Sequence, residues 1–291
     1  MKYYLGLDIG GTKIMFMLAD EKGKTVHRLK TPTTGDIDLI EKNIRSFLSS
    51  AKKSESDVCA MALGIPGTVE GGHTVLDAPA LGWHNLELSE FFSRFPFKCI
   101  AANDVTCALW AECEYGYGKS SDNIIFISIG TGLGSAFKAD GRIINGSLGM
   151  SGEIGYFVGI EQLSDRLSHF GSQEYGALES VVSGTGLDNS GKPYGLTAAD
   201  IFEARKNGDP NALRITDEFI DRLCVTCANC ASLLNPEYIV FGGGISNELG
   251  PFMERIRDCV SRLTPIRAKI EITNLKSEAG SIGTISLARS L

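Results

Sequence analysis

The sequence lacks the long apolar runs and the excess of positive charge that would indicate a membrane protein or a nucleic-acid-binding protein. No apolar run approaches the roughly 18 residues of a membrane-spanning helix, and the chain enters strand-like sequence without a basic and apolar signal segment. The formal charge of −7 and the pI near 5.2 disfavour a general affinity for nucleic acids or anionic membranes. We therefore expect a cytoplasmic protein that binds a small molecule and neither nucleic acid nor membrane.

A disulfide framework is also missing, because the eight cysteines are scattered along the chain. Reduced thiols are expected. Cys224, Cys227 and Cys230 superficially resemble a metal or redox cluster. They fall, however, on a helical pattern of apolar residues between Ile220 and Leu234, so small side chains buried on one helix face explain them better.

Neither of the two familiar nucleotide-binding motifs is present. The chain contains no G-x-x-x-x-G-K-[ST] sequence and no properly placed G-x-G-x-x-G. Low-complexity segments are absent, and no helix-turn-helix precedes the first strand. With 291 residues, 43% of them hydrophobic, the chain can still bury a sizeable core, and its length favours two domains.

The most informative segment that is present is DIGGTK at residues 8–13, directly after an apolar strand pattern. Gly10 and Gly11 allow a tight turn whose N–H groups can approach a phosphate, and the Asp8 carboxylate can hold hydrated Mg²⁺. An ordinary hairpin turn is the alternative, since residues 14–18 resemble a second strand. The same order of strand, glycine turn and strand recurs at residues 123–137, and two such turns would hold one phosphate chain from both sides.

The pattern along the rest of the chain is that of an α/β protein. Strands are expected near residues 3–9, 13–19, 58–65, 99–102, 123–129 and 238–241, and helices near 37–52 and 105–114. Residues 66–96 are rich in glycine, proline and single aromatic residues, so we expect a long, mostly irregular binding loop there.

These motifs, in this order, resemble the ROK family of repressors, open reading frames and sugar kinases. The resemblance spans nearly the whole chain and rests on DIGGTK at 8–13, GIPG at 64–67, ND at 103–104, GTGLG at 130–134, GEIG at 152–155, GALE at 176–179, SG at 183–184 and GGG at 242–244. It implies an α/β fold with two ribonuclease-H-like (actin-like ATPase) domains flanking a cleft in which ATP and sugar meet. We place a small N-terminal domain at residues 1–116, rejoined by a C-terminal helix at 281–291, and a large domain at 117–280.

The resemblance also implies roles on the sugar side. Asp104 is expected to be the catalytic base that takes the proton of a sugar hydroxyl, usually the 6-hydroxyl, with a plain helix N-cap as the alternative. Asn103 is expected to bind a sugar hydroxyl through its donor and its acceptor. Glu153 and Glu179 match two sugar-binding glutamates, or else are surface acids in glycine-rich turns. Gly67 lets the substrate approach the main chain, or simply completes a Pro-Gly turn.

On the nucleotide side the resemblance implies two phosphate turns and one turn beside the adenosine. The first contains Gly10, Gly11, Thr12 and Lys13, the second contains Thr131 and Gly132, and the adenosine-side turn contains Gly243 and Gly244. Asp8 is expected to organise Mg²⁺ through bound water, so ATP and Mg²⁺ are the expected cofactors. Residues 279–288, rich in small side chains, resemble the family's closing interdomain helix.

The chain departs from the family pattern after the GEIG turn. Many ROK proteins carry a histidine there and then a C-x-C-G-x-x-G-C zinc loop, whereas this chain has Tyr156 and no cysteine between residues 157 and 178. His169, the one histidine in that interval, cannot form a tetrahedral site alone, so no structural zinc is expected. Tyr156 either replaces the sugar contact of the histidine or opens the pocket, and Ala80 stands where relatives often have asparagine. Both departures make a β-glucoside or disaccharide acceptor more plausible than in zinc-bearing relatives.

The leading hypothesis is an ATP-dependent, hexokinase-like or glucokinase-like sugar kinase that phosphorylates a hexose or a hexose derivative. A sugar-responsive repressor of the same family is the first rival, and it would need a DNA-binding segment where only seven residues precede Asp8. A catalytically silent sugar-binding protein is the second rival, against which Asp104 and both glycine turns argue. The resemblance also suggests a homodimer.

Overall fold

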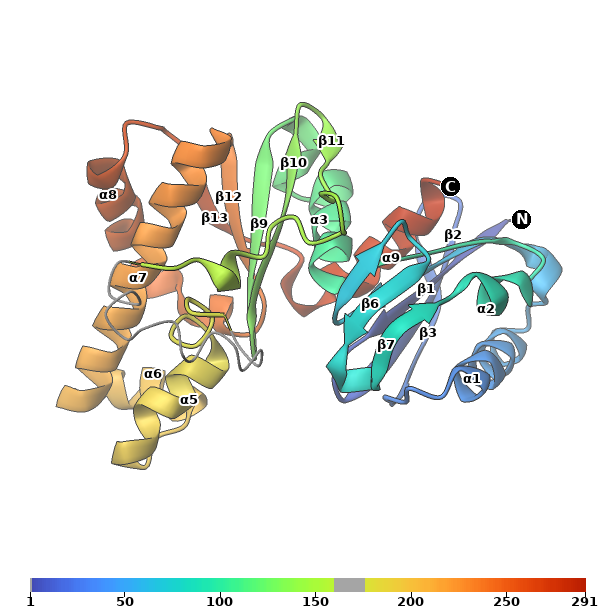
Figure 1. Cartoon of the computed structure of the whole chain (residues 1–291), viewed down its shortest axis with the longest axis horizontal. Coiled ribbons are helices and arrows are strands. Elements are labelled where there is room, and N and C mark those ends of the chain that lie inside the picture. Colours follow the sequence, from blue (N-terminus) through green and yellow to red (C-terminus); the bar gives the residue numbers. More distant parts are fainter. Residues whose placement is uncertain (1, 160–175) are drawn as a thin grey trace. The chain divides into compact units, whose positions relative to one another are not determined.

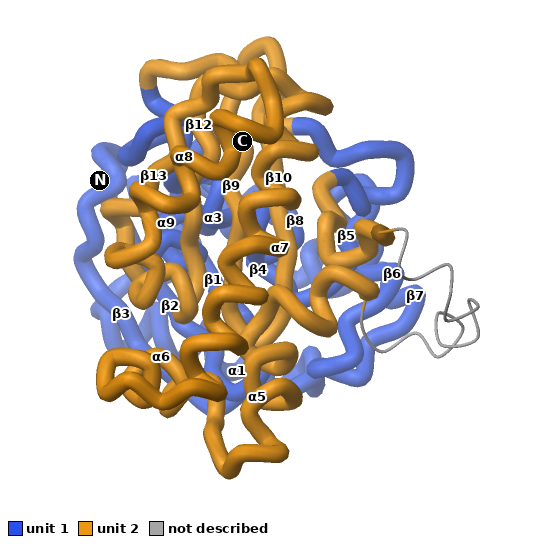
Figure 2. The backbone as a smooth tube through the Cα atoms, turned by 90° about the vertical axis from the view of Figure 1, so that its left-hand side faces the viewer, with its two compact units in different colours: residues 1–119, 144–151, 278–291 blue, residues 120–143, 152–277 orange. Residues whose placement is uncertain are grey.

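The computed structural model describes residues 2–159 and 176–291, which form two compact units (Figure 1, Figure 2). Unit 1 consists of Met1–Lys119, Ile144–Ser151 and Glu278–Leu291, and unit 2 consists of Ser120–Ile143 and Gly152–Ser277. The boundaries expected from the sequence differ from these units chiefly in Ile144–Ser151, which belongs to unit 1. The division into separately folding domains stays a prediction.

Unit 1 is built on a five-stranded sheet with the order β3-β2-β1-β4-β8. The strands are β1 (Tyr3–Ile9), β2 (Lys13–Asp20), β3 (Thr25–Pro32), β4 (Val58–Ile65) and β8 (Lys98–Asn103). β1, β4 and β8 are parallel, while β2 and β3 continue the sheet as antiparallel neighbours. The register pairs Asp8 with Gly64 and Ile65 with Asn103, so the residues at the carboxyl ends of these three strands share one edge of the sheet.

The helices of unit 1 are α1 (Ile37–Ser50), α2 (Ser89–Ser93), α3 (Asp104–Tyr115) and α9 (Ala279–Arg289). Small residues let α9 pack closely on β1 and α3. A Cβ atom on Gly6 would lie 2.2 Å from Oγ1 of Thr284, and one on Gly283 would lie 1.6 Å from the carbonyl oxygen of Cys107. The helix expected at residues 279–288 is confirmed, and its role in closing two domains stays a prediction.

Residues 66–96 do not form the irregular loop expected from their composition. They contain a three-stranded antiparallel sheet of β5 (Thr68–Glu70), β6 (Thr74–Ala78) and β7 (Trp83–Glu87), followed by α2. The expectation is wrong because these strands are too short for an alternation of apolar residues to stand out among the glycines and prolines. Val75, Leu81 and Leu88 nevertheless reach the core of unit 1, with at most 7% of each residue exposed.

Unit 2 repeats the same arrangement of strands in a second five-stranded sheet, of order β11-β10-β9-β12-β13. Its strands are β9 (Ile124–Ile129), β10 (Leu133–Ala139), β11 (Arg142–Ile143), β12 (Tyr238–Gly242) and β13 (Lys269–Ile272). β9 and β10 form a hairpin as β1 and β2 do, and β12 runs parallel to β9. Because the register pairs Ser128 with Gly242, the glycine turns that follow β9 and β12 lie at the same edge.

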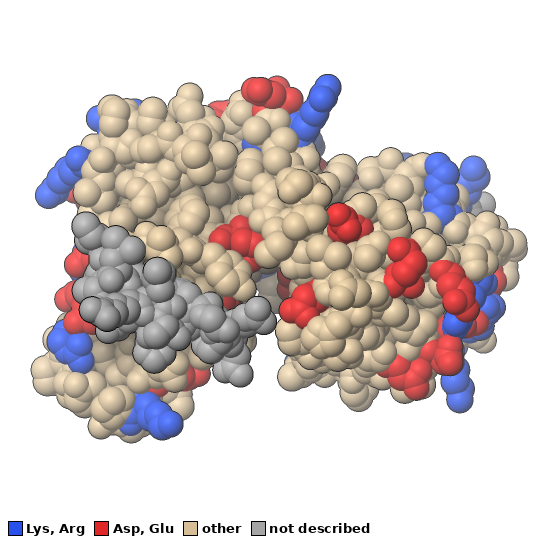
Figure 3. All heavy atoms as spheres, in the orientation of Figure 1, with Lys and Arg blue, Asp and Glu red and all other residues tan. Residues whose placement is uncertain are grey.

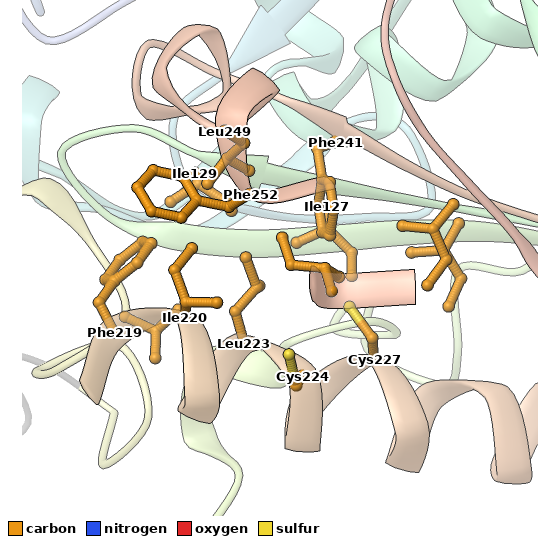
Figure 4. Close-up of a cluster of buried hydrophobic side chains, with 14 of the residues drawn as sticks. Ile127, Ile129, Phe219, Ile220, Leu223, Cys224, Cys227, Phe241, Leu249 and Phe252 are labelled. Carbon is orange, nitrogen blue, oxygen red and sulfur yellow. The ribbon is translucent and has the colours of Figure 1, made fainter. Parts of the chain in front are cut away.

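The helices of unit 2 include α5 (Gly184–Gly191), α6 (Ala198–Lys206), α7 (Pro210–Leu234) and α8 (Met253–Leu263). In Figure 4, Cys224 and Cys227 of α7 lie among apolar side chains of the sheet, such as Ile127 and Phe241. Both thiols are fully buried, so their interpretation as core residues on a helix face is confirmed. Burial also raises the pKa of Cys230 to about 12, which makes that thiol a poor nucleophile at neutral pH.

The described residues show neither a membrane helix nor a preformed metal cluster. None of their helices combines the length and the hydrophobicity that crossing a bilayer requires. On the face drawn in Figure 3, Lys and Arg side chains of each unit are interspersed with Asp and Glu.

No group of three or more His, Cys, Asp or Glu side chains among the described residues is arranged to hold a metal ion. His169 and most of the interval in which zinc ligands were sought lie outside the described residues, so the absence of zinc stays a prediction.

Candidate functional site

The first glycine turn joins β1 to β2 in unit 1. The N–H of Gly10 donates to the carbonyl oxygen of Lys13 at 2.8 Å, and a Cβ atom on Gly11 would meet nothing within 4 Å. Thr33, which no sequence motif marks, holds the turn in place. Its hydroxyl donates to the oxygen of Gly10 at 2.6 Å, and its N–H donates to the oxygen of Thr12 at 3.1 Å. The turn therefore has a fixed backbone and an open surface, as a phosphate-binding turn requires.

Asp8 lies half-buried at the end of β1, immediately before this turn. The hydroxyl of Ser281 donates to its Oδ2 atom at 2.8 Å, and a Cβ atom on Gly280 would lie 2.8 Å from the same oxygen. Burial raises the pKa of Asp8, while the hydrogen bond from Ser281 opposes that rise. A nearby cation stabilises the charged form of a carboxylate in such surroundings. Because Mg²⁺ prefers oxygen ligands, these residues fit a hydrated Mg²⁺.

Asn103 and Asp104 lie at the junction of β8 and α3. Asn103 is the N-cap of the helix, because its Oδ1 atom accepts from the N–H groups of Val105 at 2.8 Å and Thr106 at 3.2 Å. Its amide also donates to the carbonyl oxygen of Gly67 at 3.0 Å. Asp104 is therefore the first helical residue and not the plain cap of the alternative interpretation. The expectation that Asn103 offers both its acceptor and its donor to a sugar needs correction, since the helix and Gly67 use both groups and one amide hydrogen is left.

The two candidate carboxylates of unit 1, Asp8 and Asp104, both influence the pKa of the same thiol. Burial is the main cause that raises the pKa of Cys107, and the negative charges of both carboxylates add to it. The register of the parallel strands places both acids at the same edge of the sheet, although they are far apart in the sequence. Gly67 has a packing explanation, because a Cβ atom there would lie 2.2 Å from the carbonyl oxygen of Asp77. The approach of a substrate to the main chain at Gly67 stays a prediction.

The second glycine turn, between β9 and β10, borders a cavity of about 590 Å³ within unit 2. Thr131 and Gly244, which belongs to the turn after β12, both line the cavity. Gly132 and Gly243 are not among the lining residues. Gly243 has a φ of +83°, and a Cβ atom on it would lie 2.4 Å from the carbonyl oxygen of Ile129, so both the backbone conformation and the packing require glycine there. The volume suits a ligand of nucleotide size. Helices α5 and α6 and the turn residues supply the other lining residues: Gly130, Gly184, Thr185, Asp188, Ala198, Ala199, Phe202, Ile245 and Glu248.

The lining from α5 and α6 was not predicted from the sequence. These residues are ordinary small, apolar or acidic side chains without a motif, and only the fold brings them to the glycine turns. The pair SG at residues 183–184 was the one available signal, and Ser183 does begin α5 as its N-cap, with its hydroxyl accepting from the N–H of Gly186 at 3.0 Å.

Glu153 and Glu179 come together in unit 2, although they were predicted from separate motifs. Burial raises the pKa of Glu153, and the charge of Glu179 raises it further. Both side chains are half-buried, which disagrees with the alternative that they are surface acids. Tyr156 follows Glu153 by one short helical turn, and 54% of it is exposed. Sugar binding by these three residues stays a prediction.

Two α/β units that each carry a glycine turn in the leading hairpin of a five-stranded sheet define the actin-like ATPase fold. The chain belongs to the ROK family, whose family model matches residues 4–290. The resemblance found in the sequence is thereby confirmed over nearly the whole chain.

Relatives of the chain include sugar kinases. A glucokinase from Halalkalibacterium halodurans is 30% identical, over 97% of this chain and 93% of the relative. An N-acetylmannosamine kinase from Yersinia pestis is 26% identical, over 98% of both chains. Among solved structures, a ROK family glucokinase from Streptomyces griseus in complex with glucose and AMPPNP has a TM-score of 0.78 and 27% identity, covering 99% of this chain and 100% of that chain.

Proposed function

We propose that this chain is an ATP-dependent sugar kinase that phosphorylates a hexose or a hexose derivative at its 6-hydroxyl. The observation that carries the proposal is the placement of Asp104 at the start of α3, on the sheet edge that also holds Asp8 and the first glycine turn. Phosphoryl transfer requires a general base, a carboxylate that can bind hydrated Mg²⁺ and a turn that binds phosphate. The glucokinases and the N-acetylmannosamine kinase among the relatives support the same reaction class.

In the proposed reaction, Asp104 accepts the proton of the sugar hydroxyl while that oxygen forms a bond to the γ-phosphorus. The bond between the γ-phosphorus and the bridging oxygen breaks, and ADP leaves with that oxygen. Asn103 caps α3 and so holds the backbone of Asp104 in place before the substrate binds. Magnesium, when bound, would neutralise charge on the β- and γ-phosphates, with Asp8 as the carboxylate that orients its water ligands.

As phosphate-binding residues we propose Gly10, Gly11, Thr12 and Lys13 in unit 1, and Thr131 and Gly132 in unit 2. The cavity beside Thr131 and Gly244 would receive the nucleoside, with the apolar side chains of Ala199, Phe202 and Ile245 available to the base.

For the acceptor we propose Glu153 and Glu179 as ligands of sugar hydroxyls. Carboxylates accept hydrogen bonds from O–H donors, and vicinal hydroxyls suit two acids whose charges influence each other. The exposed ring of Tyr156 offers a surface on which a sugar can stack. This exposure supports a substituted hexose, such as a β-glucoside or a disaccharide, as a candidate acceptor beside glucose.

The test is ADP release from Mg·ATP with a panel of glucose, mannose, fructose, allose, N-acetylmannosamine, N-acetylglucosamine, a β-glucoside and cellobiose. We expect at least one sugar to stimulate release, and Asp104→Asn to lower kcat for that sugar by about 10²–10⁴ without changing the melting temperature. Asp140→Asn is the matched control, since Asp140 is exposed in a surface turn. Stimulation by no sugar would refute the kinase and favour a binding protein, and wild-type turnover by Asp104→Asn would refute the assigned base.

A further inference from the structure

The carboxylate of Glu179 is bonded to the second glycine turn. Its Oε1 atom accepts from the N–H of Leu133 at 3.0 Å, and its Oε2 atom accepts a longer bond from the N–H of Gly176 at 3.4 Å. A Cβ atom on Gly132 would lie 2.2 Å from Oε1, so the missing side chain at Gly132 makes room for the carboxylate. Because hydrogen bonds to a charged acceptor are stronger than neutral ones, this contact fixes the backbone where the turn enters β10.

The other side of the turn is held by residues only a few positions after Glu179. The N–H of Gly184 donates to the carbonyl oxygen of Gly130 at 2.7 Å. Thr185 donates twice to the oxygen of Thr131, from its N–H at 3.1 Å and from its hydroxyl at 3.0 Å. The turn that borders the nucleotide-sized cavity is therefore clamped between the side chain of Glu179 and the start of α5.

The segment that carries Glu179 is also attached to the turn that carries Glu153. The N–H groups of Leu178 and Glu179 both donate to the carbonyl oxygen of Gly155, each at 3.0 Å. A Cβ atom on Gly176 would lie 2.1 Å from that oxygen, so the two pieces of backbone are in direct contact. One short segment of unit 2 thus contacts both the turn that carries the proposed sugar acid Glu153 and the phosphate turn.

We propose that Glu179 is a positioning residue for the second phosphate turn, in addition to its role as a sugar ligand, an inference that rests on the proposed function. The hydrogen bond to Leu133 holds the turn in the geometry that receives the nucleotide, before any sugar binds. A sugar hydroxyl that donates to the same carboxylate fixes its orientation, so acceptor binding and nucleotide binding become linked through one side chain.

The test is binding of Mg·AMPPNP without sugar, measured by calorimetry. Glu179→Ala and Glu179→Asp should each bind about tenfold more weakly than wild type, since alanine has no acceptor and the shorter aspartate carboxylate does not reach Leu133. Glu179→Gln should bind within about threefold of wild type, because its amide oxygen still accepts from Leu133. Glu254→Ala, at an exposed glutamate of α8 in the same unit, is the matched control and should bind as wild type does.

Hydrogen exchange of the Leu133 amide in the ligand-free protein gives a second readout that needs no ligand. Exchange should accelerate in Glu179→Ala and Glu179→Asp and return toward the wild-type rate in Glu179→Gln. Wild-type nucleotide affinity in the folded alanine and aspartate variants would overturn the proposal. Equal weakening in alanine and glutamine would also overturn it, because charge and not the hydrogen bond would then be responsible. Failure of the wild-type protein to bind AMPPNP would instead refute the proposed kinase function.

Discussion

Asp8→Asn should stabilise the ligand-free protein at neutral pH, although it removes the proposed magnesium ligand. Burial raises the pKa of Asp8 above its ordinary value of 3.8, and the Ser281 hydroxyl offsets part of that rise. A raised pKa means that the folded state binds the proton more tightly than the unfolded chain does. The stabilisation from this proton is complete below about pH 3.8 and is lost as the pH rises through the folded-state pKa. At pH 7 the ionised carboxylate therefore opposes folding.

The size of this stabilisation depends on the hydrogen bond from Ser281, which asparagine keeps, and on the buried charge, which asparagine removes. The amide oxygen of asparagine can still accept the hydrogen bond that Ser281 now donates at 2.8 Å, so that contact is retained. The desolvated charge disappears, and we expect a gain of about 1–2 kcal/mol in the free energy of unfolding at pH 7. For a folding unit of this size, such a gain raises Tm by roughly 3–6 °C.

The assay is urea and thermal unfolding of wild type, Asp8→Asn and the exposed control Asp140→Asn, in EDTA and without nucleotide. The gain of Asp8→Asn over wild type should shrink as the pH is lowered from 7 toward 4, because protonated Asp8 and asparagine are then both neutral. The control should show no gain that shrinks as the pH is lowered, because its carboxylate is exposed. A variant less stable than wild type at pH 7, or a gain that does not change with pH, would refute the reasoning about the buried charge.

Three further outcomes are expected. Gly283→Ala should destabilise unit 1 by about 2–3 kcal/mol in urea unfolding, since the new Cβ atom would lie 1.6 Å from the oxygen of Cys107. Gly11→Ala should change the free energy of unfolding by less than about 0.5 kcal/mol, because its Cβ atom would meet nothing within 4 Å. Similar effects of the two changes would contradict the packing argument. Cys227→Ser should lower stability by about 1–3 kcal/mol in thermal melts, because the core would bury a hydroxyl, and an unchanged Tm would argue against that burial. Metal analysis should find well under one zinc per chain, and about one tightly held zinc per chain would refute the zinc-free expectation.

The sequence is sufficient to predict the elements whose signals are local. Apolar strands followed by glycine turns at residues 8–13 and 130–134 predict both leading hairpins, because strand pattern and turn chemistry act over a few residues. Cys224 and Cys227 could likewise be placed in a core, since their spacing matches one helix face.

Contacts between distant residues could not be predicted in the same way. Ser281 bonds to Asp8 across 273 positions, and nothing in its neighbourhood marks it as a ligand of that carboxylate. The choice of Asn103 over Asp104 as the cap of α3 depends on the backbone angle at which β8 ends. A capping signal is shared by both residue types, so the sequence leaves their order open.

The two glycine turns are held by the same kind of contact in spite of their different sequences. The first closes with a bond from the N–H of Gly10 to the oxygen of Lys13, and the second is one residue shorter, with a bond from the N–H of Gly130 to the oxygen of Gly132. In each, a threonine from outside the motif donates both its hydroxyl and its N–H to turn carbonyls: Thr33 in unit 1 and Thr185 in unit 2. A carbonyl oxygen that accepts these hydrogen bonds repels an incoming phosphate less, because part of its negative charge is compensated by the donor. The glycines allow the turns to form, and the threonines orient the carbonyl groups, which explains why a search for glycine motifs finds the turns and misses the residues that hold them.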